Sequence, residues 1–150
     1  MITLIRTDAS HPSFKNLIKH LDVYLAKMDG DAHEFFSQYN TTENLNEVVL
    51  AFKDEQAVAC GAFKPYDANT VEIKRMYVDT NCRGEGLATK VLLELEVWAK
   101  SQGFTHAILE TGTAYKDAIA LYQKNGYQKI PNYDQYIGSD LSTCFKKELN

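Results

Sequence analysis

The sequence predicts a mixed α/β fold whose strands and helices follow in the order β-α-α-β-β-β-α-β-α-β-β. Two observations carry this prediction: short stretches rich in β-branched and aromatic residues, and longer stretches whose apolar residues recur at three- and four-residue steps. Strands that follow one another directly indicate meander connections, and strands separated by a helix indicate crossovers. The expected strands are 1–7, 48–52, 57–63, 71–78, 107–109, 127–130 and 141–149, and the expected helices are 14–28, 32–39, 87–98 and 115–125.

The first strand, 1–7, is indicated by apolar residues that alternate with polar ones. Ser10 or Ser13 can cap the helix that follows, because a serine hydroxyl accepts a hydrogen bond from the first turn. The apolar positions of this helix are Phe14, Leu17, Ile18, Leu21, Tyr24, Leu25 and Met28. The run 29–31 ends it, and a second short helix and a polar linker, residues 40–46, come next.

A hairpin is expected before the middle of the chain. Residues 48–52 and 57–63 read as strands, and Lys53, Asp54 and Glu55 form the turn between them. Residues 65–69 then turn the chain into the central strand, 71–78.

The central strand leads into a glycine-containing turn, Asn81 to Gly86, and then into a long helix. The apolar stripe of this helix consists of Leu87, Val91, Leu92, Leu95 and Trp98. Gly84 and Gly86 let the backbone bend and keep side chains out of the way of an incoming group. The free N–H groups of the first helical turn, together with the helix dipole, favour an anion such as phosphate in the bend.

Gln102 and Gly103 terminate the long helix, and the short buried strand 107–109 follows. The last helix, 115–125, is closed by Gly126 in a C-terminal capping role. Two final strands flank an irregular loop, 131–139. No internal repeat and no domain boundary is visible, so a single domain over 1–150 is expected.

Composition narrows the class of protein. Hydrophobic residues make up 45% and charged ones 24%, which is typical of a globular protein. A net charge of −4 disfavours nucleic-acid binding, and no apolar stretch approaches a membrane span. Three cysteines without paired spacing argue against a disulfide framework or a zinc site, and no metal is expected. We therefore expect a cytoplasmic protein that needs no membrane partner, and a homodimer is compatible with the sequence.

The glycine turn has several interpretations. It could be a turn that simply precedes a helix. A dinucleotide site would need a third glycine, where the chain has Thr89, and an acidic residue about 20 positions further on. A nucleotide P-loop needs four residues between its glycines and a following Lys-Ser/Thr, and the chain has neither.

Two motifs resemble those of one known family. Arg83-Gly84-Glu85-Gly86-Leu87-Ala88 looks like the acetyl-CoA pyrophosphate loop of the GNAT superfamily of acyltransferases. Downstream, Ala118-Ile119-Ala120-Leu121-Tyr122-Gln123-Lys124-Asn125-Gly126-Tyr127 is similar to that family's A-x-x-L-Y-x-x-x-G-F/Y segment. The resemblance covers about residues 45–148, and two motifs in the right order are more specific than either alone.

The resemblance implies a GNAT-like fold: a central, mostly antiparallel twisted sheet of six to seven strands flanked by about four helices. It implies an acetyl-CoA-dependent N-acetyltransferase that acts on a primary amine of a small molecule or a protein by direct attack. The implied acetyl-CoA-binding residues are Met76, Tyr77, Val78, Arg83, Gly84, Glu85, Gly86, Leu87, Ala88, Thr89, Tyr115 and Ala118. Backbone N–H groups near Met76 would polarise the carbonyl, and the backbone of Val78 would pair with the pantetheine arm. These groups are free only if the next strand diverges.

The resemblance also implies catalytic residues. Tyr122 falls where the family places a tyrosine that protonates the departing CoA sulfur, although a core tyrosine is the alternative. Glu72 stands four residues before Met76, is expected on the same face of the strand, and could be the base that deprotonates the amine. A structural glutamate paired with Lys74 or with a nearby arginine is the alternative. Glu110 is a second candidate base.

Other side chains carry weaker hypotheses. Arg83 could contact a phosphate or be a solvated surface arginine. Asn81 and Tyr115 depart from the family pattern, which has Gln or Arg more often at the first position and often an asparagine at the second. Cys82 is read as an incidental thiol. The histidines, at 11, 20, 33 and 106, form no recognisable triad.

Two rival functions remain at this stage: a non-catalytic acyl-CoA-binding module, and a plain structural or interaction domain. The presence of Tyr122 and two candidate carboxylates favours catalysis. The acceptor would be selected by the first two helices and the loop 131–139. The aromatic residues that could line its pocket or fill the core are Tyr24, Phe35, Tyr39, Tyr133 and Tyr136.

Overall fold

The computed structural model of the protein describes residues 1–32, 37 and 45–150. Its strands are β1 (Ile2–Thr7), β2 (Glu47–Lys53), β3 (Gln56–Pro65), β4 (Thr70–Val78), β5 (His106–Gly112), β6 (Gln128–Ile130) and β7 (Ser142–Glu148). Its α-helices are α1 (Pro12–Asp29), α3 (Leu87–Ser101) and α4 (Lys116–Lys124), with short 3₁₀ turns at Gly30–Ala32, Thr80–Cys82 and Asp134–Tyr136. The second expected helix, 32–39, and the linker 40–46 fall mostly outside the described residues.

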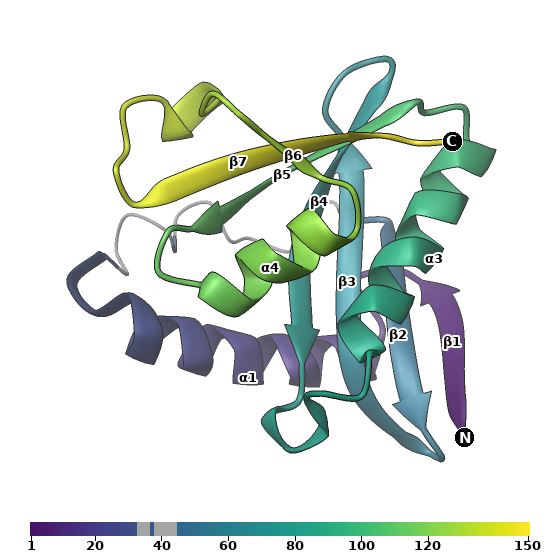
Figure 1. Cartoon of the computed structure of the whole chain (residues 1–150). Coiled ribbons are helices and arrows are strands. Elements are labelled where there is room, and N and C mark those ends of the chain that lie inside the picture. Colours follow the sequence, from purple (N-terminus) through teal and green to yellow (C-terminus); the bar gives the residue numbers. More distant parts are fainter. Residues whose placement is uncertain (33–36, 38–44) are drawn as a thin grey trace.

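The strands form one sheet in the order β1-β2-β3-β4-β5-β7-β6 (Figure 1). Neighbouring strands are antiparallel except for β4 and β5, which run parallel and are connected through α3. This confirms the predicted mixed α/β fold with a mostly antiparallel sheet. Within the described residues, no helix is long and apolar enough to cross a membrane.

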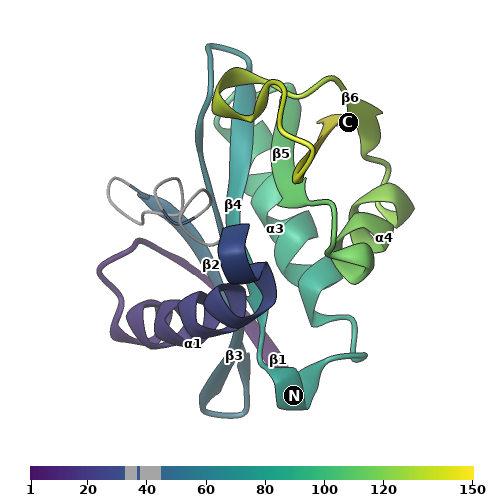
Figure 2. The ribbon, with the colours of Figure 1, turned by 90° about the vertical axis from the view of Figure 1, so that its left-hand side faces the viewer.

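The helices cover both faces of the sheet. Figure 2 shows α1 on one side and α3 and α4 on the other. The apolar stripe of α1 packs on Val48, Leu50, Cys60 and Ala62, which point to one face of β2 and β3. The stripe of α3 packs on the opposite face, against residues that include Val49, Ala51, Phe63, Val71 and Ile73. The alternation of side chains along each strand thus builds two separate cores.

The start of α1 differs from the sequence prediction. The predicted caps, Ser10 and Ser13, are wrong, because the N-cap is His11, whose Nδ1 accepts a hydrogen bond from the Ser13 N–H at 3.1 Å. Pro12 occupies the first helical position, where its fixed φ suits a helix start. The cap position therefore falls on the residue before the proline.

A β-bulge interrupts the ladder between β3 and β4. Cys60 pairs with Tyr77 and Ala62 pairs with Lys74, so one residue of β3 faces two residues of β4. Within the bulge Arg75 adopts a φ of +57°, which is uncommon for a residue with a Cβ. Bulges of this kind re-aim side chains and often lie next to active sites.

The bulge overturns one prediction about β4. Glu72 and Met76 were expected on the same face, but Met76 packs toward α3 while Glu72 lies on the α1 side. The extra residue shifts the alternation by one position, which sequence spacing alone does not reveal. Gly61 accommodates Met76, because a Cβ there would collide with the Met76 sulfur and lie 2.9 Å from Leu95 of α3.

The parallel pairing of β4 and β5 is short. It covers Thr70 to Glu72 on β4 and His106 to Ile108 on β5, although both strands continue beyond these residues. The strands diverge from there, as Figure 1 shows. The backbone groups near Met76 were expected to be free only if the next strand diverges, and β5 does diverge from β4.

Candidate active site

A cleft of about 730 Å³ opens where β4 and β5 diverge. Its walls come from both strands, the C-terminal half of α1, the glycine turn, the start of α3, and α4. Of the predicted site residues, the following line it: Glu72, Met76, Tyr77, Val78, Arg83, Gly84, Gly86, Leu87, Ala88, Thr89, Tyr115, Ala118 and Tyr122. Glu85 lies outside the lining, and its carboxylate pairs with Lys53 at 2.9 Å on the surface.

The glycine turn has the backbone that a phosphate cradle needs. Gly84 and Gly86 have φ values of +82° and +78°, and a Cβ on either would meet nothing within 4 Å. Gly86 is the N-cap of α3, so the N–H groups of the first turn begin directly after it. An anion placed there would accept hydrogen bonds from those groups and gain from the dipole of a 15-residue helix.

Arg83 connects the glycine turn to α1. Its guanidinium lies over the ring of Tyr24, 4.8 Å from the centroid, and its Nε donates to the Val78 carbonyl at 3.3 Å. This is a cation–π contact at the mouth of the cleft. The side chain is exposed, and its predicted contact with a phosphate stays a prediction.

Tyr115 lines the cleft at the N-terminal end of α4. Its hydroxyl donates to the carboxylate of Asp29 at the end of α1, and its ring lies 6.4 Å from that of Tyr24. Gly112 allows this placement, because a Cβ there would lie 2.6 Å from the Tyr115 ring. The tyrosine therefore ties the start of α4 to the end of α1.

Glu110 lies in the cleft wall on β5. Its Oε2 accepts a hydrogen bond from the Ser142 hydroxyl at 2.8 Å. Burial is the largest influence on this carboxyl and raises its pKa to about 7, against the opposing effects of Ser142 and Lys74. A carboxyl with this pKa can take up and release a proton near neutral pH.

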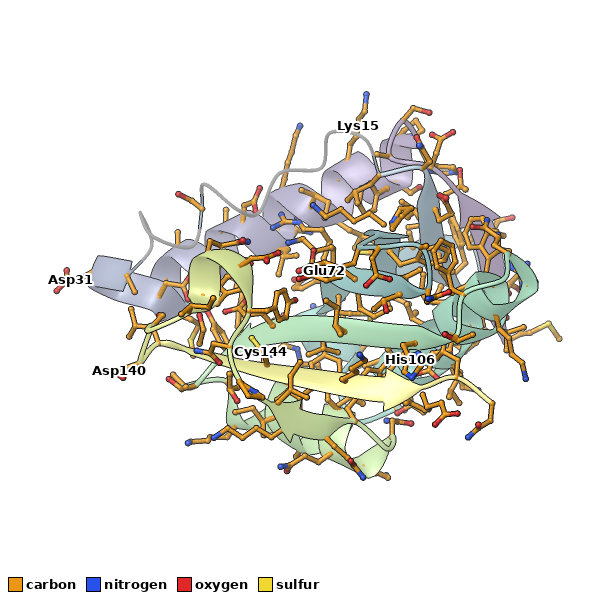
Figure 3. The ribbon with its side chains drawn as sticks, turned by 90° about the horizontal axis from the view of Figure 1, so that it is seen from above. Lys15, Asp31, Glu72, His106, Asp140 and Cys144 are labelled. Carbon is orange, nitrogen blue, oxygen red and sulfur yellow. The ribbon has the colours of Figure 1, made fainter. Side chains whose placement is uncertain are left out.

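Glu72 has a different environment. It is 5% exposed, accepts a hydrogen bond from the Tyr133 hydroxyl at 2.7 Å, and lies 3.9 Å from Lys64 and 4.0 Å from Lys74. Figure 3 shows it in the space between α1 and β5. Tyr133 ties Glu72 to the loop before β7, and the contact with Lys74 is the one that the structural alternative expected. The role of Glu72 as a base stays a prediction.

Tyr122 is the one buried residue of α4. Its ring packs edge-on against Tyr127 at 5.8 Å and lies 6.4 Å from that of Phe145. Burial, and secondly the charge of Glu110, raise its pKa above the ordinary value of a phenol. The hydroxyl therefore stays protonated at neutral pH and keeps a proton to donate.

The aromatic residues that could line the acceptor pocket differ in where the structure places them. Tyr24 and Tyr136 line the cleft, whereas Tyr133 reaches it only through Glu72. Phe35, Tyr39 and His33 lie outside the described residues. The other three histidines do not line the cleft.

Lys74, Arg75 and Ser142 were not singled out as site residues from the sequence. Lys74 and Arg75 line the cleft beside the bulge, and Arg75 pairs with Asp22 of α1. Ser142 reaches Glu110 from β7, 32 positions along the chain. A motif search could not have found it, because neither the residue type nor its spacing is distinctive.

Comparison with known proteins defines the class. Residues 14–127 match the family model described as the acetyltransferase (GNAT) family. An acyl-CoA N-acyltransferase candidate from Klebsiella pneumoniae, solved as a crystal structure, is 30% identical with a TM-score of 0.83, covering 100% of this chain and 99% of that one. An IAA acetyltransferase of Azospirillum brasilense is 26% identical over 99% of this chain and 98% of its own length.

A GNAT acetyltransferase from Elizabethkingia anophelis, solved with acetyl-CoA bound, shares the fold at 22% identity and a TM-score of 0.71, covering 99% of this chain and 98% of that one. The chain belongs to the GNAT family of acetyltransferases. It is an acetyl-CoA-dependent N-acetyltransferase, a transferase of the EC 2.3.1 group, and its acceptor is open.

Proposed function

We propose that this protein moves the acetyl group of acetyl-CoA to a primary amine of a small molecule or a protein, by direct attack of the amine on the thioester. One observation carries this proposal. A single cleft contains the glycine turn, the part of β4 beyond its pairing with β5, a carboxyl that titrates near neutral pH, and a protonated tyrosine. These are the groups that a donor site, a base and an acid require.

The residues present fit acetyl-CoA. The N–H groups after Gly86 and the open space around Gly84 and Gly86 suit a pyrophosphate, and Arg83, which belongs to the same turn, can add a positive charge. The edge of β4 that β5 leaves at Glu72 can pair with the pantetheine arm in the manner of an added strand. When bound, acetyl-CoA supplies an acyl group activated as a thioester.

Glu110 is the proposed base. An ammonium has no free electron pair, so the acceptor amine must give a proton to a carboxylate or to water that contacts it. The neutral nitrogen then forms the C–N bond as the C–S bond breaks, and the second proton that it loses on becoming an amide passes to solvent water. Both carboxylates line the cleft and each accepts a hydrogen bond from a hydroxyl group. What supports Glu110 over Glu72 is its pKa near 7, whereas Glu72 also lies within 4.0 Å of the ammonium groups of Lys64 and Lys74.

Tyr122 is the proposed acid. The thiolate that leaves carbon takes up a proton, and the phenol of Tyr122 lies in the same cleft as Glu110. Its raised pKa keeps the donor form dominant at neutral pH, and the hydrogen bond that it donates becomes stronger as negative charge develops on sulfur. Because the three cysteines are free, we also propose that the enzyme works in the cytoplasm.

A panel of amines tests the proposal. The panel should contain polyamines, amino acids, aromatic amines and peptides with free N-termini or lysines, and the readout is CoA release in the presence of acetyl-CoA. We expect at least one amine to raise CoA release above hydrolysis, with a matching acetylated product by mass spectrometry. Failure of every amine, with intact acetyl-CoA binding, would favour a binding module instead.

A matched pair of variants separates the two carboxylates. Glu110→Gln is expected to lower the rate with the best amine by about 10²-fold, because the base is lost. Glu72→Gln keeps the base and should retain most of the rate, with a change in KM for the amine if Tyr133 and its loop shift.

The pH dependence follows from the same assignment. Protonated Glu110 cannot accept a proton, so the parental rate should fall as pH drops through about 7, and this limb should vanish in Glu110→Gln. Rate–pH profiles of the parent and both variants check this. A parental profile in Glu110→Gln with loss in Glu72→Gln would reverse the assignment.

A further inference from the structure

Ser142, the first residue of β7, reaches the proposed base from across the sheet. It lies opposite Gly112 in the β5–β7 ladder and is 5% exposed. Its hydroxyl donates to Glu110 Oε2 at 2.8 Å. Ser142 is buried and Glu110 is half-buried in the cleft wall, so this hydrogen bond is partly shielded from solvent.

Ser142 is itself held by the loop before β7. The side-chain amide of Asn132 donates to the carbonyl of Ser142 at 3.1 Å, and also contacts the carbonyls of Tyr136 at 3.0 Å and Ser139 at 3.1 Å. One asparagine thus binds two carbonyls of the loop and the carbonyl of the first residue of β7. The position of the Ser142 hydroxyl is therefore set by the loop and by the ladder together.

Several titratable groups face Glu110 from the elements packed around it. They are Lys74 and Glu72 on β4, Asp29 on α1, Tyr115 and Tyr122 at α4, Tyr136 before β7, and Cys144 on β7. Lys74 favours the charged carboxylate, whereas Glu72, Asp29 and burial oppose it. The Ser142 hydroxyl donates a hydrogen bond that also favours the charged carboxylate.

We propose that Ser142 is a positioning residue for catalysis, whose hydroxyl fixes the orientation of the Glu110 carboxylate and keeps it ionised in the working pH range. This rests on the proposed role of Glu110 as the base. The hydroxyl touches no reacting atom and acts only through the glutamate. A serine at the start of the last strand thereby links the loop 131–141 to the chemistry.

The test measures the Glu110 titration directly, without any acceptor. Protein labelled with ¹³C at glutamate carboxyl carbons is titrated by NMR, and the resonance missing from Glu110→Gln identifies the group. The parental midpoint is expected at about 7. Ser142→Ala removes a donor that stabilises the charged form, so its midpoint should rise by about one pH unit.

Kinetics gives a second readout. At pH 7 a rise of about one unit lowers the ionised fraction, and with it the rate with the best amine of the panel, by about five-fold. The loss should disappear near pH 9, where both proteins are ionised. Ser142→Thr, which keeps the hydroxyl, should restore the parental midpoint.

Thr143→Val is the matched control, because it removes a buried hydroxyl from the adjacent position of the same strand. Its midpoint should stay parental. An unchanged midpoint in Ser142→Ala, or an equal rise in Thr143→Val, would overturn the inference. Full turnover in Glu110→Gln would instead remove the proposed base, so the two failures are distinguishable.

Discussion

Replacing Gly86 with valine should weaken the binding of acetyl-CoA by about 100-fold or more while the protein still folds. Gly86 has a φ of +78° and caps α3, and its Cβ position is open. A branched side chain there would occupy the space that a phosphate needs. A phosphate that loses two charge-assisted hydrogen bonds, at about 1.5 kcal/mol each, loses about 3 kcal/mol of binding free energy. This corresponds to an increase of about 100-fold in Kd.

The same substitution also strains the backbone, because a β-branched residue rarely adopts a positive φ. Gly103→Val is a matched control, since Gly103 has a φ of +96°, open space around its Cβ, and a place at the far end of α3. Both variants should lose thermal stability, but only Gly86→Val should lose affinity in calorimetric titration. Equal, parental affinities would remove the glycine turn from the donor site.

Much of the fold could be predicted because its signals are local. The stripe of α3 recurs over four turns, and the hairpin of β2 and β3 is bounded by polar turn residues. The bulge at Arg75 could not be predicted, because it depends on which residues of β3 and β4 meet. That pairing depends on contacts between strands, and it places Glu72 and Met76 on opposite faces of β4.

The candidate site shows the same division. The glycine turn and Tyr122 belong to contiguous motifs, so residue type and spacing were sufficient to select them. The choice between Glu72 and Glu110 depends on burial and on partners such as Tyr133 and Ser142, which come from distant segments. Sequence spacing contains no information on burial or on these distant partners. It therefore could not decide which of the two carboxylates is the better candidate for the base.

Tyr122→Phe should lower kcat by about 10²- to 10³-fold while the affinity for CoA changes little. The substitution keeps the ring and its packing against Tyr127 and Phe145, and removes only the hydroxyl. The hydroxyl acts on charge that develops as the thiolate leaves, so its loss affects the transition state rather than the bound ground state.

Steady-state kinetics with the best amine of the panel, calorimetry with CoA, and thermal unfolding together check this expectation. A tyrosine that serves only the core would shift the melting temperature and leave kcat almost unchanged. Tyr127→Phe is the matched control, because its hydroxyl donates to Glu96 at 2.9 Å and does not line the cleft. A parental kcat in Tyr122→Phe would remove this residue from the mechanism, and water would then protonate the thiolate.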